Sequence, residues 1–256
     1  MSSGRGVARN GLKGSLMRAA DKLGAGDPLR ALRLSLAPHY VRRDAIDNEH
    51  LAAIIGSLLD EDSNCLDVGA HGGQVLEAML RCAPKGRHIA YEPLPDLQRP
   101  LAAQFPTVDV RCAALSREPG TTTFTKVTDA LGYSGFRAQD YPREFATETI
   151  EVAVESIDAS LPRDWVPTLM KIDVEGAERD VLAGGIETIT RHRPTVIFEF
   201  QRTSAPHYNC GPADIYSLLC DQAKLRIFDI DGGGPYSLNR LEETFEEGQI
   251  WNFVAH

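Results

Sequence analysis

Short apolar runs alternate along most of the chain with segments whose apolar residues repeat at helical spacing. The runs that predict strands are 65–68, 88–91, 108–114, 168–172 and 194–198. Between the first two runs, Val75, Leu76, Met79 and Leu80 fall on one face of a helix over 74–82. Strands that alternate with helices are typical of a parallel sheet covered by helices. The pattern therefore predicts an α/β fold.

Further elements follow from the same reasoning. Helices are expected over 44–59, 95–104 and 176–190 and from Gly211 onward, with a connector at 38–41. Two β-branched stretches predict an antiparallel pair around an irregular loop; these are 121–126, 149–154 and the loop 129–141. A Gly-Gly-Gly-Pro turn separates the last two expected strands, 225–230 and 250–254. These two strands are also expected to be antiparallel.

A glycine-rich loop joins the first predicted strand to its helix, in the stretch Cys65-Leu66-Asp67-Val68-Gly69-Ala70-His71-Gly72-Gly73. Such a strand, loop and helix open nucleotide-binding sheets. The dinucleotide fingerprint needs glycines at 69, 71 and 74, but His71 and Gln74 occupy two of these positions. No Gly-Lys-Ser/Thr follows, as a P-loop requires. The loop therefore suits a nucleoside ligand without a pyrophosphate.

Acidic residues near the ends of the first two predicted strands indicate which ligand this is. Asp67 can attract a ligand ammonium group, directly or through water. Glu92 ends the second strand, where an acidic side chain can accept hydrogen bonds from both ribose hydroxyls. Small residues at the end of the third predicted strand leave room for adenine; they are Ala113, Ala114 and Ser116. We therefore predict S-adenosylmethionine as the cofactor.

Two more predicted strands end in acids, Asp173 and Glu199. The carboxyl ends of parallel strands meet at one edge of a sheet, so both acids are expected beside the methyl donor. Together with His207 they could hold Mg²⁺, which prefers oxygen ligands and lowers the pKa of a coordinated hydroxyl. Alternatively, one of them is a general base for the acceptor hydroxyl. A third interpretation is that they only cap the helices or turns that follow.

Other polar residues near the expected crevice have several interpretations. His71 could act as a base, although orienting the cofactor or plain exposure is favoured. Glu175 and Glu178 fall in the first turn of the next helix, where the helix dipole is enough to explain them. Four side chains in irregular segments suit the face and hydroxyls of a sugar: Tyr133, Ser134, Tyr208 and Asn209.

Charge and its distribution along the chain bear on its partners and its domain organisation. The net charge of −9 and the pI of about 5.3 argue against nucleic acid as the main partner. Basic residues cluster before residue 44, so we predict a basic, helical N-terminal arm over 1–43 and a second domain over 44–256. Leu12, Leu16, Ala20 and Leu23 give this arm an apolar stripe whose need for cover suggests a homodimer.

Cysteine usage and the lack of long apolar runs bear on the compartment. The five cysteines are odd in number and show no C-x-x-C spacing, which favours free thiols in a reducing compartment. No apolar run approaches the roughly 20 residues of a membrane span, and the N-terminus lacks an apolar signal core. We therefore expect a cytoplasmic protein with no transmembrane segment.

Several short strings resemble the FkbM family of S-adenosylmethionine-dependent methyltransferases. They are Leu66-Asp67-Val68-Gly69-Ala70, Tyr91-Glu92-Pro93, Ala114-Leu115-Ser116, Lys171-Ile172-Asp173-Val174-Glu175-Gly176-Ala177-Glu178 and Asn252-Phe253-Val254. The resemblance runs from about Cys65 to the C-terminus, and Lys171–Glu178 is its most specific part. His71 and Arg117 depart from the residues common in the family. The whole chain also resembles mycobacterial sugar O-methyltransferases of the methylmannose polysaccharide type, some of which use Mg²⁺.

The resemblance implies a Rossmann-like class I methyltransferase fold. Its sheet would have seven mostly parallel strands with an antiparallel last strand, preceded by N-terminal helices. By this match Asp67, Gly69 and Glu92 would contact the cofactor and Asp173 would lie at the transfer site. The full predicted cofactor site is Asp67, Gly69, Ala70, His71, Gly73, Glu92, Pro93, Ala113, Ala114, Ser116 and Asp173.

The sequence thus predicts an O-methyltransferase that acts on a hydroxyl of a sugar or oligosaccharide, with Asp173, Glu199 and His207 as catalytic residues. The predicted metal ligands are Asp173 and Glu199. Three alternatives stay open: methylation of a small non-sugar metabolite, a non-catalytic S-adenosylmethionine-binding protein, and a nicotinamide-dependent oxidoreductase. His71 in the loop disfavours the last of these.

Overall fold

The computed structural model describes residues 37–137 and 144–256, and the chain divides into two units, Met1–Glu49 and His50–His256. Helix α3 (His39–Leu58) runs through the boundary between them. The predicted connector at 38–41 is therefore wrong, because residues 39–41 are helical. Pro38 precedes the helix directly, and proline is well tolerated at a helix start. Residues 1–36 of the predicted arm lie outside the described residues.

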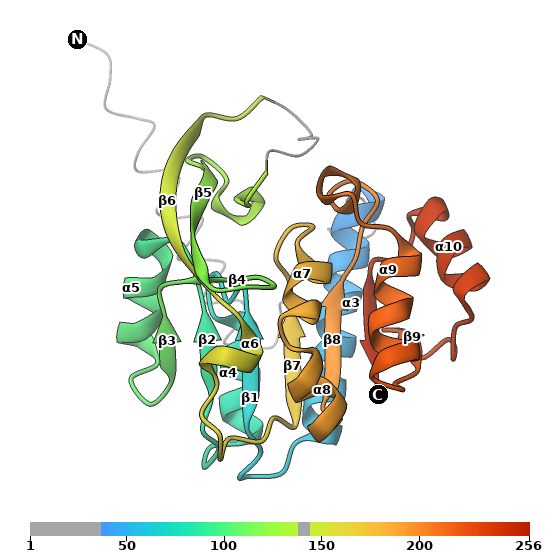
Figure 1. The fold of residues 1–256 in the computed structure, drawn as a ribbon, viewed down its shortest axis with the longest axis horizontal. Helices are drawn as coiled ribbons and strands as arrows, with labels where there is room; N and C mark the ends of the chain where they lie inside the picture. Colours follow the sequence, from blue (N-terminus) through green and yellow to red (C-terminus); the bar gives the residue numbers. More distant parts are fainter. Residues whose placement is uncertain (1–36, 138–143) are drawn as a thin grey trace. The chain divides into compact units, whose positions relative to one another are not determined.

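A seven-stranded sheet forms the centre of the second unit, in the order β3-β2-β1-β7-β8-β10-β9 (Figure 1). The strands are β1 (Cys65–Val68), β2 (Ile89–Tyr91), β3 (Asp109–Arg111), β7 (Leu169–Ile172), β8 (Thr195–Glu199), β9 (Ile227–Asp229) and β10 (Asn252–Ala255). Only β10 is antiparallel to its neighbours, β8 and β9. This order and this single reversal confirm the predicted Rossmann-like class I methyltransferase fold.

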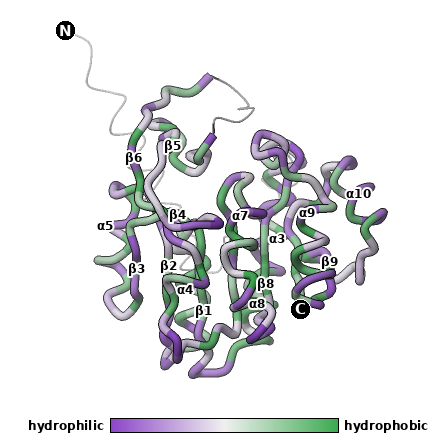
Figure 2. Tube along the Cα trace, viewed as in Figure 1, coloured by the Kyte–Doolittle hydropathy of each residue, from purple (hydrophilic) through white to green (hydrophobic). Residues whose placement is uncertain are grey.

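Helices bury both faces of the sheet. On one face, Leu76 and Met79 of α4 (Gln74–Cys82) pack in one hydrophobic cluster with Leu101 of α5 (Pro95–Gln104). On the other face, a second cluster joins the strands to α6 (Ile157–Ser160), α7 (Glu178–Ala183), α8 (Ile186–His192), α9 (Pro212–Tyr216) and α10 (Leu238–Glu247). The middle of the sheet, around β1, β7 and β8, is coloured mostly as hydrophobic (Figure 2). Burial on both faces explains why β1, β7 and β8 are apolar runs without alternation.

A second, three-stranded sheet has the order β4-β6-β5 and consists of β4 (Ala114–Leu115), β5 (Gly120–Val127) and β6 (Thr147–Glu155). Strands β5 and β6 are antiparallel, with Thr123 opposite Glu151, which confirms the predicted pair. They extend beyond the ends of β1 and β2 (Figure 1). The single strand predicted over 108–114 is divided instead: β3 pairs with β2, and β4 pairs with β6. An apolar run does not show where a strand changes its pairing partner.

The helix predicted over 176–190 is also divided, into α7 and α8, at Gly184 and Gly185. A Cβ atom at Gly184 would lie 2.2 Å from the carbonyl oxygen of Ser116, and one at Gly185 would lie 2.8 Å from Ile157 Cδ1. The two glycines therefore let the chain pass close to its neighbours. The sequence analysis missed α10, which begins at the cap Ser237, whose hydroxyl accepts the Arg240 N–H at 3.3 Å.

Shorter turns complete the described residues. They are the 3₁₀ turns η1 (Leu131–Tyr133) and η2 (Ala205–Tyr208), and η3 (Ser217–Gln222), a π-helical continuation of α9. No helix in the described part of the chain has both the length and the apolar character needed to cross a bilayer.

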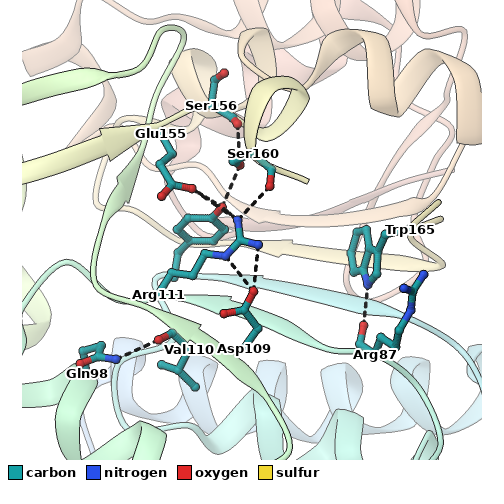
Figure 3. A network of polar contacts seen from close by, with 10 residues as sticks. Arg87, Gln98, Asp109, Val110, Arg111, Glu155, Ser156, Ser160 and Trp165 are labelled. Atoms are coloured by element: carbon teal, nitrogen blue, oxygen red, sulfur yellow. Dashed lines mark hydrogen bonds and ion pairs between the residues drawn. The ribbon is translucent and has the colours of Figure 1, made fainter. Parts of the chain in front are cut away.

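A partly buried polar network joins the two sheets beside the end of β2. The Arg111 guanidinium lies between Asp109, Glu155 and the carbonyl of Ser160 (Figure 3). The hydroxyl of Tyr91, which is fully buried, donates to Glu155 Oε2 at 2.7 Å and lies 2.8 Å from Ser160 Oγ. Burial is the main reason that the pKa of Tyr91 is raised to about 12. The network fixes the strand end that leads directly into Glu92.

Candidate functional site

The glycine-rich loop after β1 is held between the ends of β2 and β7. The amides of Gly69 and Ala70 both donate to the carbonyl of Tyr91, each at 3.0 Å. Gly69 has a φ of 81°, and a Cβ atom there would lie 1.9 Å from the carbonyl oxygen of Asp173. Only glycine fits this approach. Gly73, with a φ of 76°, begins α4 where a Cβ atom would meet Phe105 at 2.5 Å.

Glu92 is fixed by two backbone amides of this region. Its Oε2 accepts the His71 N–H and its Oε1 accepts the Leu94 N–H, each at 2.9 Å. The side chain is 4% exposed, and burial raises its pKa in spite of these two bonds. A carboxylate oxygen can accept more than one hydrogen bond, so both oxygens keep acceptor capacity. The predicted role on ribose hydroxyls fits this geometry, and His71 contributes through its backbone.

Asp67 is buried, with 2% of its surface exposed. Burial raises its pKa to about 7, while the charge of Lys171 acts in the opposite direction. Within residues 37–137 and 144–256, its Oδ2 has no hydrogen-bond partner. A buried acceptor without a donor is costly, so this atom suits a ligand ammonium group or a water bound to one. The residues present therefore fit the amino-acid part of S-adenosylmethionine.

Lys171 is the functional candidate that the sequence analysis missed. It lies opposite Asp67 in the pairing of β1 with β7, is 4% exposed, and places its Nζ 3.2 Å from Asp173 Oδ2. Burial acts to lower the pKa of Lys171, but the carboxylates of Asp173, Glu199 and Asp67 outweigh it and raise the pKa. The available signal was a lysine inside a strand that is otherwise apolar, because a buried lysine needs a charged partner.

Asp173 and Glu199 lie at the ends of the neighbouring strands β7 and β8, as predicted. The Asp173 side chain is 36% exposed, so its carboxylate can be reached from solvent. The Glu199 side chain is less accessible, and burial followed by the charges of Asp173 and Glu175 raises its pKa well above the usual value. His207 is half-buried in η2, after β8. The site thus has an accessible carboxylate, Asp173, beside the Lys171 ammonium. Its second acid, Glu199, has a pKa above that of an ordinary glutamate.

The residues do not fit the predicted Mg²⁺ site. In the described part of the chain, no three His, Cys, Asp or Glu side chains are grouped to hold a metal ion. The cation next to Asp173 is the Lys171 ammonium. A second cation at the same carboxylate would be repelled by that charge.

Glu178 lies in the first turn of α7, as predicted, and has a further role there. It is 2% exposed, and its Oε1 accepts the amides of Val174 and Gly176, each at 3.1 Å. These bonds stabilise the turn after β7, in which Glu175 has a φ of 57° and Gly176 a φ of 106°. Burial raises the pKa of Glu178 to about 7. Glu178 therefore shapes the turn beside Asp173, beyond any interaction with the dipole of α7.

The four predicted sugar contacts separate into two kinds. Ser134 and Tyr208 are 9% and 6% exposed, and their hydroxyl oxygens accept the backbone amides of Val127 at 3.0 Å and Arg137 at 3.1 Å. Tyr133 is 39% exposed, with its ring stacked on Phe145 at a centroid distance of 5.4 Å. Asn209 is exposed and ends η2 with a φ of 50°. Of these four residues, Tyr133 and Asn209 are exposed to solvent.

The predicted adenine residues lie where the chain passes from one sheet to the other. Ala113 and Ala114 are 3% and 7% exposed, and the Ser116 amide donates to the carbonyl of Glu155 at 2.9 Å. Pro93 is half-buried directly after Glu92. Small buried side chains next to a fixed acid are compatible with a flat ring held between the two sheets.

Comparison with known proteins identifies a family. Residues 67–224, more than half of the chain, match the family described as the methyltransferase FkbM domain. No curated protein matches the chain significantly.

Several solved structures are similar at low identity. The methyltransferase FkbM of Methylobacillus flagellatus KT has 15% identity and a TM-score of 0.48, over 77% of this chain and 44% of that one. A TehB-like SAM-dependent methyltransferase of Corynebacterium glutamicum has 10% identity and a TM-score of 0.45, over 93% and 97%. The cofactor-bound protein Rv0187 from MTB has 11% identity and a TM-score of 0.45, over 82% and 78%. This chain thus spans less than half of the length of the M. flagellatus protein.

Proposed function

Because the chain belongs to the family of FkbM-domain methyltransferases, we propose that it transfers a methyl group from S-adenosylmethionine to a hydroxyl group of a sugar or oligosaccharide. The observation that carries this proposal is the grouping of acids at the strand ends. Asp67 has a buried oxygen that no donor among the described residues reaches, and Asp173 has an accessible carboxylate next to the Lys171 ammonium.

Two acids hold the cofactor in this proposal. Asp67 Oδ2 accepts a hydrogen bond from the ammonium group, and that positive charge favours the ionised form of Asp67. Glu92 accepts hydrogen bonds from the ribose hydroxyls with the acceptor capacity that the His71 and Leu94 amides leave. When bound, S-adenosylmethionine supplies a methyl group on a positively charged sulfur, which becomes a neutral thioether after transfer.

Asp173 acts on the acceptor. Its carboxylate accepts the proton of the acceptor hydroxyl as that oxygen forms its new bond to the methyl carbon. The Lys171 ammonium, 3.2 Å from Asp173 Oδ2, orients this carboxylate. Burial is the main reason that the pKa of Glu199 is raised well above its usual value, and its carboxyl group is available for a hydrogen bond with a second oxygen of the acceptor. The proton, the methyl group and the charges balance without a further reactant.

The charges of the site favour an uncharged acceptor. Asp173, Glu175 and Glu199 contribute carboxyl groups near the strand ends, and the pKa of Glu199 is raised first by burial and then by the charges of Asp173 and Glu175. A phosphate or carboxylate on the acceptor would be repelled by them. Hydroxyl groups can donate to these oxygens, and the exposed face of Tyr133 suits the C–H face of a sugar ring. These features support a neutral sugar.

The Lys171 ammonium lies next to Asp173, the carboxylate that the sequence analysis assigned to Mg²⁺. Our proposal is therefore that transfer needs no added divalent cation. Activity measured after exhaustive treatment with EDTA should stay within about twofold of the untreated enzyme. Loss of activity that returns only on addition of Mg²⁺ would contradict this part of the proposal.

The homodimer and the cytoplasmic location stay predictions. Sedimentation equilibrium of the full chain tests whether it forms a homodimer.

The test of the function is a methyl-transfer assay with labelled S-adenosylmethionine. The acceptor panel contains mannosides, other neutral sugars, small alcohols and small amines. We expect transfer to a neutral sugar and a fall of at least about 100-fold in kcat/KM for Asp173→Asn, since general base catalysis contributes this much. Asp164→Asn is the matched control, because Asp164 is an exposed acid paired with Arg87.

Each other result has a defined meaning. Turnover of alcohols or amines alone would assign the chain to small non-sugar metabolites. Binding of S-adenosylhomocysteine in calorimetry without turnover of any acceptor would indicate a non-catalytic binding protein. Full activity of Asp173→Asn would show that the general base is another residue.

A further inference from the structure

A segment after β5, Leu131–Arg137, runs across the loops that follow three strands of the main sheet; we call it the bridging segment. Near its start, a Cβ atom at Gly132 would lie 3.8 Å from His71 Nε2, in the loop after β1. Further along, a Cβ atom at Gly135 would lie 3.8 Å from Glu175 Cβ and 2.9 Å from the Tyr208 hydroxyl. The bridging segment therefore passes next to the loops that carry the proposed cofactor and acceptor residues.

One side of the bridging segment is attached to the second sheet. Thr125 and Gly135 exchange two backbone hydrogen bonds, at 2.8 Å and 3.1 Å. The Ser134 hydroxyl accepts the Val127 amide, and the ring of Phe136 packs edge-on against Phe124 at 5.5 Å. These contacts fix the position of the segment relative to β5.

The other side is attached through Tyr208. Its buried hydroxyl accepts the Arg137 amide at 3.1 Å, and the Arg137 guanidinium lies 5.8 Å from the centre of its ring. The ring itself packs on Gly176, where a Cβ atom would lie 2.8 Å from it. Burial is the main cause that raises the pKa of Tyr208 to about 12, so the phenol stays protonated. One side chain thus links the turn after β7, the turn after β8 and the bridging segment.

We propose that Tyr208 is a positioning residue: it holds the bridging segment across the strand ends, where the segment forms one wall of the acceptor site. Only the part that concerns the acceptor rests on the proposed function. The role differs from the sugar contact expected for Tyr208, because its hydroxyl oxygen already accepts a backbone amide. The hydrogen bonds that Glu92 accepts come from the His71 and Leu94 amides and not from the bridging segment, so we expect loss of this wall to affect the acceptor more than the cofactor.

The test compares Tyr208→Phe with Tyr236→Phe in the full chain. Tyr236 is also buried, and its hydroxyl donates to Asp229 Oδ2 at 2.8 Å, so the control removes a similar bond elsewhere in the fold. In Tyr208→Phe, amides 134–137 should exchange with deuterium about 5- to 10-fold faster, as expected for loss of one buried hydrogen bond. In Tyr236→Phe these amides should be unchanged.

Kinetics separate positioning from general loss of structure. With methyl α-mannoside, or the best neutral sugar of the panel, Tyr208→Phe should raise the acceptor KM by about 5- to 10-fold. The KM of S-adenosylmethionine and the affinity for S-adenosylhomocysteine should stay within twofold. Equal exchange and equal acceptor KM in the two variants would overturn the proposal. A parallel rise in both KM values would do so as well, since it would indicate a structural role only.

A second variant tests the same contact in case Tyr208→Phe does not fold. Gly135→Ala adds the Cβ atom that would lie 2.9 Å from the Tyr208 hydroxyl, so it disturbs the same contact from the other side. It should accelerate exchange in the segment, and its effect should be smaller in the Tyr208→Phe background, where the clashing oxygen is gone. If the effects of Gly135→Ala and Tyr208→Phe on amide exchange were additive, residue 135 and the Tyr208 hydroxyl would not be in contact. If the wild type methylates no acceptor, the proposed function fails, while the exchange data still decide the role of Tyr208.

Discussion

Asp67→Asn should make the cofactor-free protein more stable at neutral pH while it weakens cofactor binding. The Asp67 carboxyl group is 2% exposed and has an oxygen without a partner among the described residues. Its ionised form is therefore costly in the folded state without ligand. Asparagine keeps the shape of the side chain and removes its charge. The substitution therefore shows whether the charge lowers the stability of the cofactor-free protein while it strengthens cofactor binding.

The magnitude follows from the pKa of Asp67, which burial raises from 3.8 to about 7. Between these pH values the folded state binds more protons at this group than the unfolded state, so its contribution to the free energy of unfolding is lost as pH rises. The pKa of Asp67 is thus about 3 higher in the folded state, and each pKa unit corresponds to about 1.4 kcal/mol. The upper limit for the gain in the free energy of unfolding is therefore about 4 kcal/mol. The attraction to Lys171 is already included in this pKa, because it acts against burial. We expect a gain of about 1–3 kcal/mol at pH 8 and almost none at pH 4.

Urea unfolding of the cofactor-free protein at pH 4, 6 and 8, followed by the fluorescence of Trp165 and Trp251, measures this effect. Calorimetry with S-adenosylhomocysteine measures the cost to binding, which should be about 10- to 100-fold in Kd for a hydrogen bond between charged groups. Asp229→Asn is the matched control. Asp229 is 7% exposed and accepts the Gly233 amide and the Tyr236 hydroxyl, each at 2.8 Å, so this change should destabilise the protein and leave binding unaltered.

Two results would refute this reasoning. If Asp67→Asn is less stable than the wild type at pH 8, the ionised carboxylate is already satisfied in the cofactor-free protein. If its affinity for S-adenosylhomocysteine is unchanged, Asp67 does not contact the amino-acid part of the ligand.

Two further predictions concern stability. Gly69→Ala should lower the free energy of unfolding by more than about 2 kcal/mol, because Gly69 has a φ of 81° and its Cβ atom would lie 1.9 Å from the Asp173 carbonyl. Gly72→Ala should change it by less than about 0.5 kcal/mol, since a Cβ atom at Gly72 has nothing within 4 Å, and equal urea midpoints for the two variants would contradict this account. Tyr91→Phe should lower the free energy of unfolding by about 1–3 kcal/mol, because it removes a buried hydroxyl that donates to Glu155 and accepts from Arg111. An unchanged urea midpoint would show that these two hydrogen bonds do not contribute to stability.

The local order of elements could be predicted from the sequence because it depends on neighbours along the chain. The apolar run before Gly69, the helical spacing after Gly73 and the β-branched pair around 129–141 each produced the element observed. The acids at strand ends were also predictable, since parallel strands bring their carboxyl ends to one edge. These inferences need only periodicity and chain direction.

What the sequence could not supply depends on residues that are distant along the chain. The strand at 108–114 divides because its second part pairs with β6, about 40 residues further on. The roles of Lys171, Glu178 and Tyr208 depend on burial and on which backbone amides face them, and neither is encoded in local spacing. The sequence alone determined an α/β chain with acids along one edge of a sheet. The tertiary structure decided which of those acids are paired, buried or accessible, because these properties arise only when separate segments pack together.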